Sequence, residues 1–95
     1  MIRYKLSSQA AADLRSIWGY VATDNIDAAD RVLGELRNQF TKLTETPGLG
    51  HRRSDLTDRD VFFWSVFSYL VVYRPTTPLF VVRVLHSKRN ISRIL

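Results

Sequence analysis

The stretch Ser68-Tyr-Leu-Val-Val-Tyr-Arg-Pro-Thr-Thr-Pro-Leu-Phe-Val-Val-Arg-Val-Leu-His86 decides the fold of this chain. Its two halves are rich in Val, Leu, Tyr and Phe, which pack well on the pleated surface of a β-sheet. Between them lies Pro75-Thr-Thr-Pro78, and proline fixes φ and has no amide hydrogen for the sheet ladder. The stretch therefore predicts two antiparallel strands joined at this segment.

The register of this hairpin follows from its centre between Thr76 and Thr77. A symmetric hairpin there pairs Val72 with Val81, and it also pairs Leu70 with Arg83. Because side chains alternate between the two faces of a strand, one apolar face is expected to be covered by helices. That face comprises Tyr69, Val71, Tyr73, Phe80, Val82 and Val84. The opposite face is expected to be open or to face a partner, and it comprises Leu70, Val72, Arg74, Leu79, Val81, Arg83 and Leu85.

Upstream of the hairpin, the sequence predicts a short strand and a helical hairpin. The strand covers Ile2–Leu6, with Ile2, Tyr4 and Leu6 on one face. Ser7 or Ser8 is expected to cap the first helix, which fades around Thr23-Asp24-Asn25. Its apolar stripe comprises Ala10, Leu14, Ile17, Trp18 and Val21, and Asp13 and Arg15 lie off that stripe. Asp27 is expected to cap the second helix, which ends at Pro47-Gly48 and whose apolar face comprises Ala29, Val32, Leu33, Leu36, Phe40 and Leu43.

A polar loop over 48–59 leads to the β-prone run Val61–Phe67. Apolar residues on both faces of that run predict an inner strand. After the hairpin comes a short basic tail, 87–95. The predicted order is β-α-α-β-β-β, an α+β fold in which a helical hairpin packs on one face of an antiparallel sheet with an N-terminal strand. The pattern alone does not fix where the first strand inserts.

Length and composition predict one domain, residues 1–95, with a single core. Hydrophobic residues make up 45% of the chain, as is typical of a folded globular protein. The chain has no cysteine, which excludes disulfides and cysteine-ligated metals. It shows no signal peptide and no run near the ~20 apolar residues of a membrane span, so we expect a soluble, cytoplasmic protein.

The net charge of +5 is concentrated in the second half of the chain. The first 51 residues hold six basic and six acidic side chains, whereas residues 52–95 hold eight basic and three acidic ones. A basic patch on that half predicts an acidic partner, either nucleic acid or an acidic protein segment. Alternatively, these residues simply solvate the sheet edge.

The sequence carries no strong catalytic motif and predicts no cofactor and no metal. His51 and His86 lack the spacing of a metal pair, and no phosphate-binding glycine loop is present. His86, at the end of the last strand, is either a general acid or base or a histidine hydrogen-bonded at the edge of the core. Arg74 and Arg83 either grip an anionic partner or are satisfied within the sheet surface.

The order and spacing of several motifs resemble the ParE toxins of the RelE/ParE superfamily, over about Ile2 to Asn90. In the helices the matching residues are Leu6-Ser7, Ala10, Asp13-Leu14, Ile17-Trp18, Tyr20, Ala29, Leu36, Phe40, Leu43, Pro47 and Gly50. In the sheet they are Tyr69-Leu-Val-Val-Tyr73-Arg74, Arg83-Val84-Leu85-His86 and Arg89. The family's fold is the β-α-α-β-β-β arrangement expected above.

The resemblance implies the toxin half of a type II toxin–antitoxin module, of the kind linked to plasmid stabilisation. ParE-like members poison DNA gyrase by binding it, whereas RelE-like members cleave mRNA on the ribosome. The first alternative implies no catalysis and no direct nucleic-acid binding. It implies an acidic ParD-like antitoxin and gyrase as partners, with a partner-binding set of Arg59, Arg74, Arg83, His86, Lys88, Arg89 and Arg93. The second implies a catalytic set of Arg74, Arg83, His86 and Arg89. A third alternative is an inactive relic of the same fold.

Two departures from the family patterns bear on this choice. Ribonuclease members often have a tyrosine after the terminal histidine, whereas here Ser87 follows His86 and no tyrosine occurs after Tyr73. Lys88 is also the only lysine after Lys42. These absences favour binding over RNA cleavage. Conversely, the strand before the hairpin reads Val61-Phe-Phe-Trp64, with phenylalanine where ParE-like chains commonly have arginine.

Overall fold

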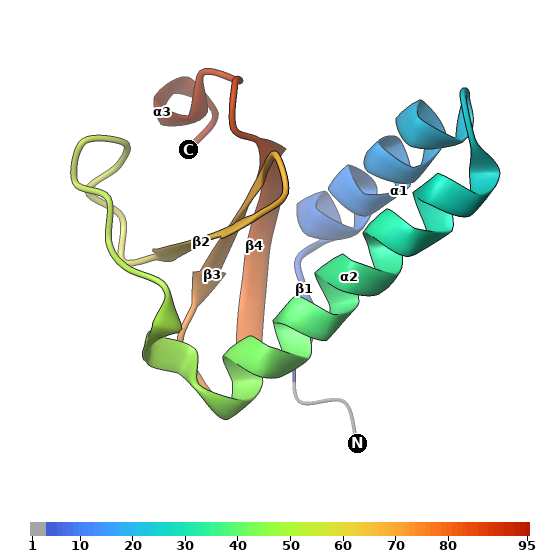
Figure 1. Ribbon diagram of the computed structural model, residues 1–95. Helices are drawn as coiled ribbons and strands as arrows, with labels where there is room; N and C mark the ends of the chain where they lie inside the picture. The colour runs from blue at the N-terminus through green and yellow to red at the C-terminus, as the bar shows by residue number, and fades with distance from the viewer. Residues whose placement is uncertain (1–3) are drawn as a thin grey trace.

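The computed structural model describes residues 4–95 of the chain (Figure 1). The expected place of Ile2 in the first strand lies outside these residues. The predicted order of elements is confirmed, with two short helices added. The elements are β1 (Tyr4–Leu6), α1 (Ser8–Ala22), α2 (Ile26–Glu45), the 3₁₀ turn η1 (Pro47–Leu49), β2 (Phe62–Val66), β3 (Tyr69–Arg74), β4 (Leu79–His86) and α3 (Ile91–Ile94).

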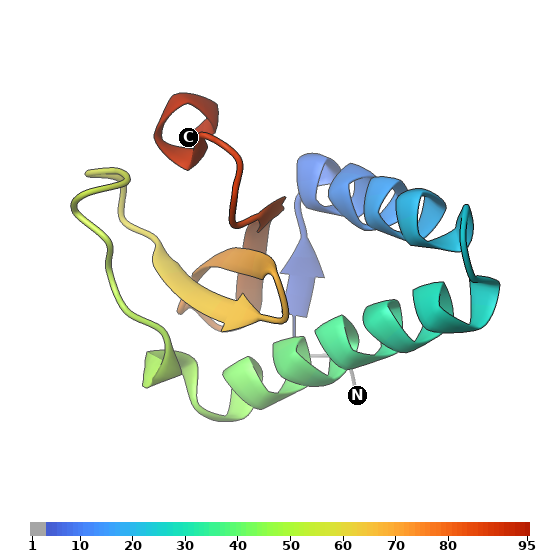
Figure 2. The same cartoon turned by 45° about the horizontal axis from the view of Figure 1, so that its top comes forward.

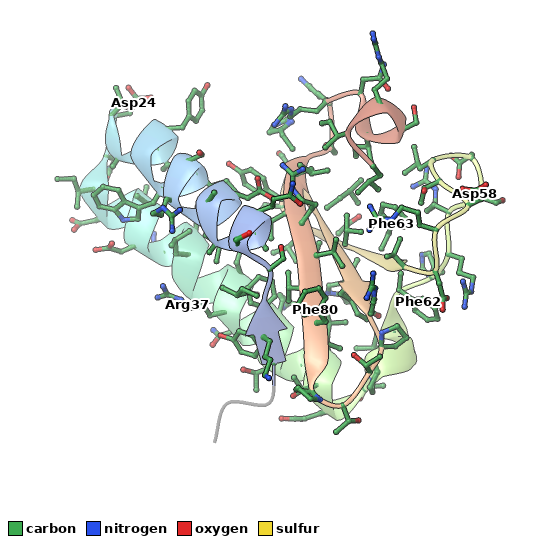
Figure 3. All side chains as sticks on the ribbon, turned by 180° about the vertical axis from the view of Figure 1, so that it is seen from behind. Asp24, Arg37, Asp58, Phe62, Phe63 and Phe80 are labelled. Atoms are coloured by element: carbon green, nitrogen blue, oxygen red, sulfur yellow. The ribbon has the colours of Figure 1, made fainter. Side chains whose placement is uncertain are left out.

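The four strands form one mixed sheet in the order β1-β4-β3-β2. β2, β3 and β4 pair antiparallel, as predicted, and β1 pairs parallel to β4. β2 therefore lies at an edge, and its prediction as an inner strand is wrong. Both of its faces are nevertheless covered, since Phe62 and Trp64 pack towards α2 while Phe63 belongs to the cluster on the other face. Figure 3 shows the two phenylalanines close to the loop that carries Asp58.

The predicted register of the hairpin is wrong by two residues, because Val72 pairs with Arg83 and not with Val81. The loop takes one residue more than a symmetric turn, so that Arg74 pairs with Phe80. A bulge in β4 then adds Val82, since the partners of Val72 and Tyr73 are not consecutive. The bulge exchanges the faces of the first half of β4. Leu79 and Val81 consequently face the helices, whereas Phe80 and Val82 face away.

Local hydrogen bonds set the helix ends. Ser7 is the N-cap of α1, as one of the two predicted candidates, and its Oγ accepts from the amide of Ala10 at 2.9 Å. The cap of α2 is Asn25 and not Asp27. Asn25 has an extended backbone and its Oδ1 accepts from the amide of Ala28 at 2.9 Å, which places Asp27 within the first turn.

The main core lies between the helical hairpin and the sheet. Its buried members are Ala10, Leu14, Ile17, Leu36, Phe40, Leu43, Val66, Val71, Tyr73, Leu79, Val81 and Val84. Trp18, predicted to belong to the stripe, is 36% exposed and donates from Nε1 to Asp30 at 2.9 Å.

The second face of the sheet is also covered, and its prediction as an open surface is wrong. The C-terminal segment folds back over this face and buries Ile91, which is 3% exposed. Figure 2 shows the helix pair on one side of the sheet and the loop after η1 and the C-terminal segment on the other. The buried cluster there comprises Val61, Phe63, Leu70, Val72, Val82, Leu85 and Ile91.

The loop after η1 is tied to the sheet at two points. The Tyr73 hydroxyl donates to the carbonyl of Pro47 at 2.6 Å and accepts from the amide of Gly50 at 3.0 Å. His51 forms an antiparallel bridge with Phe63, with N···O distances of 2.8 and 3.1 Å. These bonds satisfy backbone groups of a chain segment that has no strand of its own.

Candidate functional site

Asp13 and Arg83 join α1 to β4. Arg83 donates from Nε at 2.8 Å and from Nη2 at 2.9 Å to the two carboxylate oxygens of Asp13. The amide of Val84 donates to the same carboxylate at 2.9 Å. The Asp13 hydrogen bond raises the pKa of the Arg83 guanidinium, and the two side chains are only 16% and 12% exposed. Arg83, expected to face a partner, is therefore occupied within the fold.

Arg74 lies at the other end of the hairpin. It is exposed next to the turn, and its guanidinium carbon lies 5.7 Å from the centre of the Phe80 ring. Phe80, the partner of Arg74 in the ladder, precedes His86 by six positions in β4. At the rise of an extended strand, this places the backbones of Arg74 and His86 about 20 Å apart. The structure does not bring the four residues of the predicted catalytic set together.

His86 lies at the edge of the core, as the second of its two interpretations expects. Its ring packs edge-on against Tyr69 with 5.5 Å between centroids, opposite it in the ladder. Its Nδ1 accepts from the amide of Lys88 at 3.1 Å. The hydrogen on this imidazole consequently lies on Nε2 when the ring is neutral.

A cleft of about 380 Å³ separates α1 from the end of the sheet. We call it the α1 cleft, and its lining residues are Asp13, Ser16, Ile17, Tyr20, Tyr69, Val84, His86 and Arg89. Tyr20 is 80% exposed on its wall. Burial, with a smaller effect from Tyr20, raises the pKa of the Tyr69 hydroxyl. The cleft is mostly apolar, with basic groups on its rim.

Sequence reasoning missed this cleft, although it quoted several of its residues. The spacing of Asp13, Ser16, Ile17 and Tyr20 places all four on one face of α1, which was the signal available. The other wall depends on the pairing of β4 with β3. The register predicted from the sequence differs from the observed one by two residues, so it did not place His86 opposite Tyr69.

The other predicted partner-binding residues follow β4 in the chain or lie in the long loop before β2. Lys88, Arg89 and Arg93 are exposed, and none of them forms an ion pair within residues 4–95. Arg59 is exposed in the loop before β2. Arg52 and Arg53 in that loop pair with Asp60 at 2.6 Å and with Asp55 at 2.7 Å. Among these residues, Arg89 lines the α1 cleft, and Lys88 is its neighbour in the chain.

Two broad features of the described part of the chain also constrain function. Over residues 4–95 no three His, Asp or Glu side chains are grouped to hold a metal ion. None of the helices in this range has the length and apolar character needed to cross a membrane.

Comparison with known proteins places the chain in a family. Residues 4–91 match the model of the ParE toxin of the type II toxin–antitoxin system parDE. A solved structure titled as a chromosomal ParDE TA system from P. aeruginosa is similar in fold, with a TM-score of 0.72 and 20% sequence identity over 90% of this chain and 96% of that one. None of the curated proteins compared with the chain matches it. The chain belongs to the ParE toxin family of type II toxin–antitoxin systems.

Proposed function

We propose that this toxin acts in the cytoplasm by binding DNA gyrase and inhibiting it, and that an acidic ParD-like antitoxin neutralises it. The proposed action is binding and not catalysis. Family membership supports a toxin with an antitoxin partner. The target and the mode of action rest on the arrangement of charged groups.

The observation that carries binding over catalysis is the separation of Arg74 from His86. General acid–base cleavage of RNA needs a proton-transferring group and charge-stabilising groups within hydrogen-bond reach of one phosphate. Arg74 lies at the turn end of the hairpin, His86 lies at the opposite end, and Arg83 is held by Asp13. The remaining pair, His86 and Arg89, lines an apolar cleft.

The test is supercoiling of relaxed plasmid by purified gyrase in the presence of micromolar toxin. We expect inhibition by the wild-type chain, and weaker inhibition by Lys88→Glu/Arg89→Glu because the reversed charges lie on the exposed basic end. Arg31→Glu/Arg37→Glu is the matched control, with the same charge change on exposed positions of α2. Undiminished supercoiling at micromolar wild-type toxin would rule out gyrase as the target.

Primer extension on translated mRNA after induction of the toxin separates the ribonuclease alternative. Intact message is expected if the toxin acts by binding, whereas cuts within the ribosomal A site would establish the ribonuclease. Growth in a host without the antitoxin tests the inactive-relic alternative, because an active toxin arrests growth and a relic does not.

A further inference from the structure

β1 covers only the first part of the β4 edge that faces away from β3. It pairs with Leu79, Phe80 and Val81, and β4 continues to His86. Just beyond β1, Ser7 donates from its amide to the carbonyl of Val81 at 2.9 Å and from Oγ to the carbonyl of Val82 at 2.6 Å. The next group on this edge, the amide of Val84, donates to Asp13.

Two backbone groups on this edge of β4 are left to bond a further strand. In an antiparallel ladder, alternate residue pairs direct their N–H and C=O groups to the partner and away from it. Because the amide of Val84 turns to Asp13, the backbone groups of Val84 and His86 point away from β3. The carbonyl of His86 accepts from the amide of Arg89 at 3.0 Å. The Val84 carbonyl and the His86 amide therefore remain on the edge that faces α1.

This pair of groups has the spacing of a parallel ladder. In a parallel pair, one residue donates its N–H to position i−1 of its neighbour and accepts at its C=O from position i+1. Val84 and His86 are positions i−1 and i+1 around Leu85. A single extended residue could thus bond both groups and continue the parallel direction that β1 begins.

The side chains next to that residue would enter the α1 cleft. Neighbours in a strand alternate in face, so residues flanking the one opposite Leu85 lie on the same face as Val84 and His86. Both of these residues line the cleft. Its volume of about 380 Å³ and its walls of Ile17, Tyr20 and Tyr69 suit one large apolar side chain.

Charge identifies the kind of segment. The single acidic group of the cleft, Asp13, is neutralised by Arg83 and the Val84 amide. Arg89 and His86 lie on the rim and Lys88 is adjacent, with Lys88 and Arg89 free of ion pairs within residues 4–95. Such a rim attracts carboxylates and repels a basic segment.

We propose that an extended acidic segment of the antitoxin adds to the open edge of β4 in the parallel direction. It would anchor one aromatic or large aliphatic side chain in the α1 cleft and place carboxylates against Lys88 and Arg89. The proposal depends on the antitoxin partner and is independent of gyrase as the target. β-strand addition of this kind takes affinity from main-chain bonds and specificity from the side-chain pocket.

The experiment titrates the full-length toxin with the blocked peptide Glu-Val-Glu-Phe-Glu-Val-Glu and follows amide chemical shifts and hydrogen exchange. We expect saturable binding that protects the His86 amide from exchange, since this amide gains an acceptor. Replacing the Phe of the peptide by Ala should weaken binding about tenfold, as expected of an anchoring side chain. Replacing its Glu residues by Lys should abolish binding.

Variants of the toxin test whether the peptide binds in the α1 cleft. Tyr20→Ala and Arg89→Glu should each weaken peptide binding several-fold, and both side chains are exposed enough that the fold is retained. Ile26→Ala and Arg31→Glu are the matched controls, an exposed apolar and an exposed basic residue of α2, and they should bind as the wild type does.

Three results would each overturn the proposal: no binding at millimolar peptide, binding unaffected by Tyr20→Ala and Arg89→Glu, or binding without protection of His86. Preferential binding of a single-stranded RNA of similar length at the same residues would also overturn it, because the cleft would then be a nucleic-acid site. The supercoiling assay on the same preparations keeps the gyrase question separate. Peptide binding without gyrase inhibition would support this site and would rule out gyrase as the target.

Discussion

Asp13 and Arg83, 70 residues apart in the sequence, hold each other in a bidentate ion pair that also includes the amide of Val84. Asp13 lines the α1 cleft, and its pair with Arg83 fastens α1 to the last strand. The contribution of this pair to stability can be measured.

Asp13→Ala removes three hydrogen bonds and leaves the mostly buried Arg83 without a counter-charge. We expect the free energy of unfolding to fall by about 2–4 kcal/mol, because an uncompensated charge remains at a site of low exposure. Arg83→Met is the matched control and should cost less, about 1–2 kcal/mol, since Asp13 keeps the Val84 amide. Urea denaturation measures both, and a larger loss for Arg83→Met than for Asp13→Ala would contradict this account.

Gly50 lies against the sheet with no room for a side chain. A Cβ there would lie 2.6 Å from the Phe63 carbonyl oxygen and 2.7 Å from the Tyr73 hydroxyl. Gly50→Ala should therefore lower the free energy of unfolding by about 1–3 kcal/mol, the usual cost of overpacking. Gly48→Ala, two residues earlier, meets nothing within 4 Å and should change stability by less than about 0.5 kcal/mol. Equal thermal midpoints for the two variants would refute the close approach.

Tyr73→Phe keeps the ring and removes its hydroxyl. The Pro47 carbonyl loses its donor, and the buried amide of Gly50 loses its acceptor. We expect a loss of about 1–3 kcal/mol, the cost of leaving a buried donor unsatisfied. Hydrogen exchange should show faster opening at Gly50 and an unchanged rate at the core of α2, and a uniform increase would contradict a local role.

The same hydroxyl predicts a pH dependence at alkaline pH. Burial raises the pKa of Tyr73 above the 10.0 of a free tyrosine, so the unfolded chain loses this proton at a lower pH than the folded chain does. The contribution to stability is fully present below pH 10 and is lost as the pH rises through the folded value. Stability curves across this range should decline less steeply for Tyr73→Phe than for the wild type. Tyr4→Phe serves as the matched control.

Phe67, in the turn between β2 and β3, has φ +53° and is 66% exposed. A bulky residue in the left-handed region is unfavourable, whereas asparagine tolerates it. Phe67→Asn should raise the free energy of unfolding by about 0.5–1 kcal/mol. A decrease in the thermal midpoint would mean that the ring stabilises the turn despite its exposure.

The predictions that held were those that depend on local pattern. Ser7 as a cap and the C-terminal ends of both helices follow from residue chemistry within one or two turns, and the hairpin strands follow from their β-branched and aromatic residues. The cap of α2 is a local exception, because Asn25 takes the place predicted for Asp27. The structure departs where a distant group decides. Asp13 lies off the apolar stripe in the sequence and is nevertheless enclosed, because Arg83 and Val84 reach it from the other end of the chain.

The register of the hairpin and the covering of the second sheet face were also predicted wrongly, because both depend on groups that are distant in the sequence. The bulge at Val82 cannot be seen in an alternating apolar strand, since both possible registers bury similar side chains. The apolar character of β2 indicated that both faces were covered, and an edge strand beneath Ile91 satisfies this as well as an inner strand does. The two-residue error in register also explains why the α1 cleft was not predicted, since its second wall is formed by residues of β3 and β4.

The pairing of β1 with β4 has a consequence for synthesis of the toxin. The three residues of β1 pair with residues of β4 that lie 75 positions further along the chain. The Asp13–Arg83 pair likewise spans 70 positions. Because a ribosome makes the chain from its N-terminus, neither contact can form before β4 has been synthesised and has left the ribosome. The α1 cleft, whose second wall is β4, is therefore assembled late. A nascent chain that still lacks β4 offers no such cleft to an antitoxin segment.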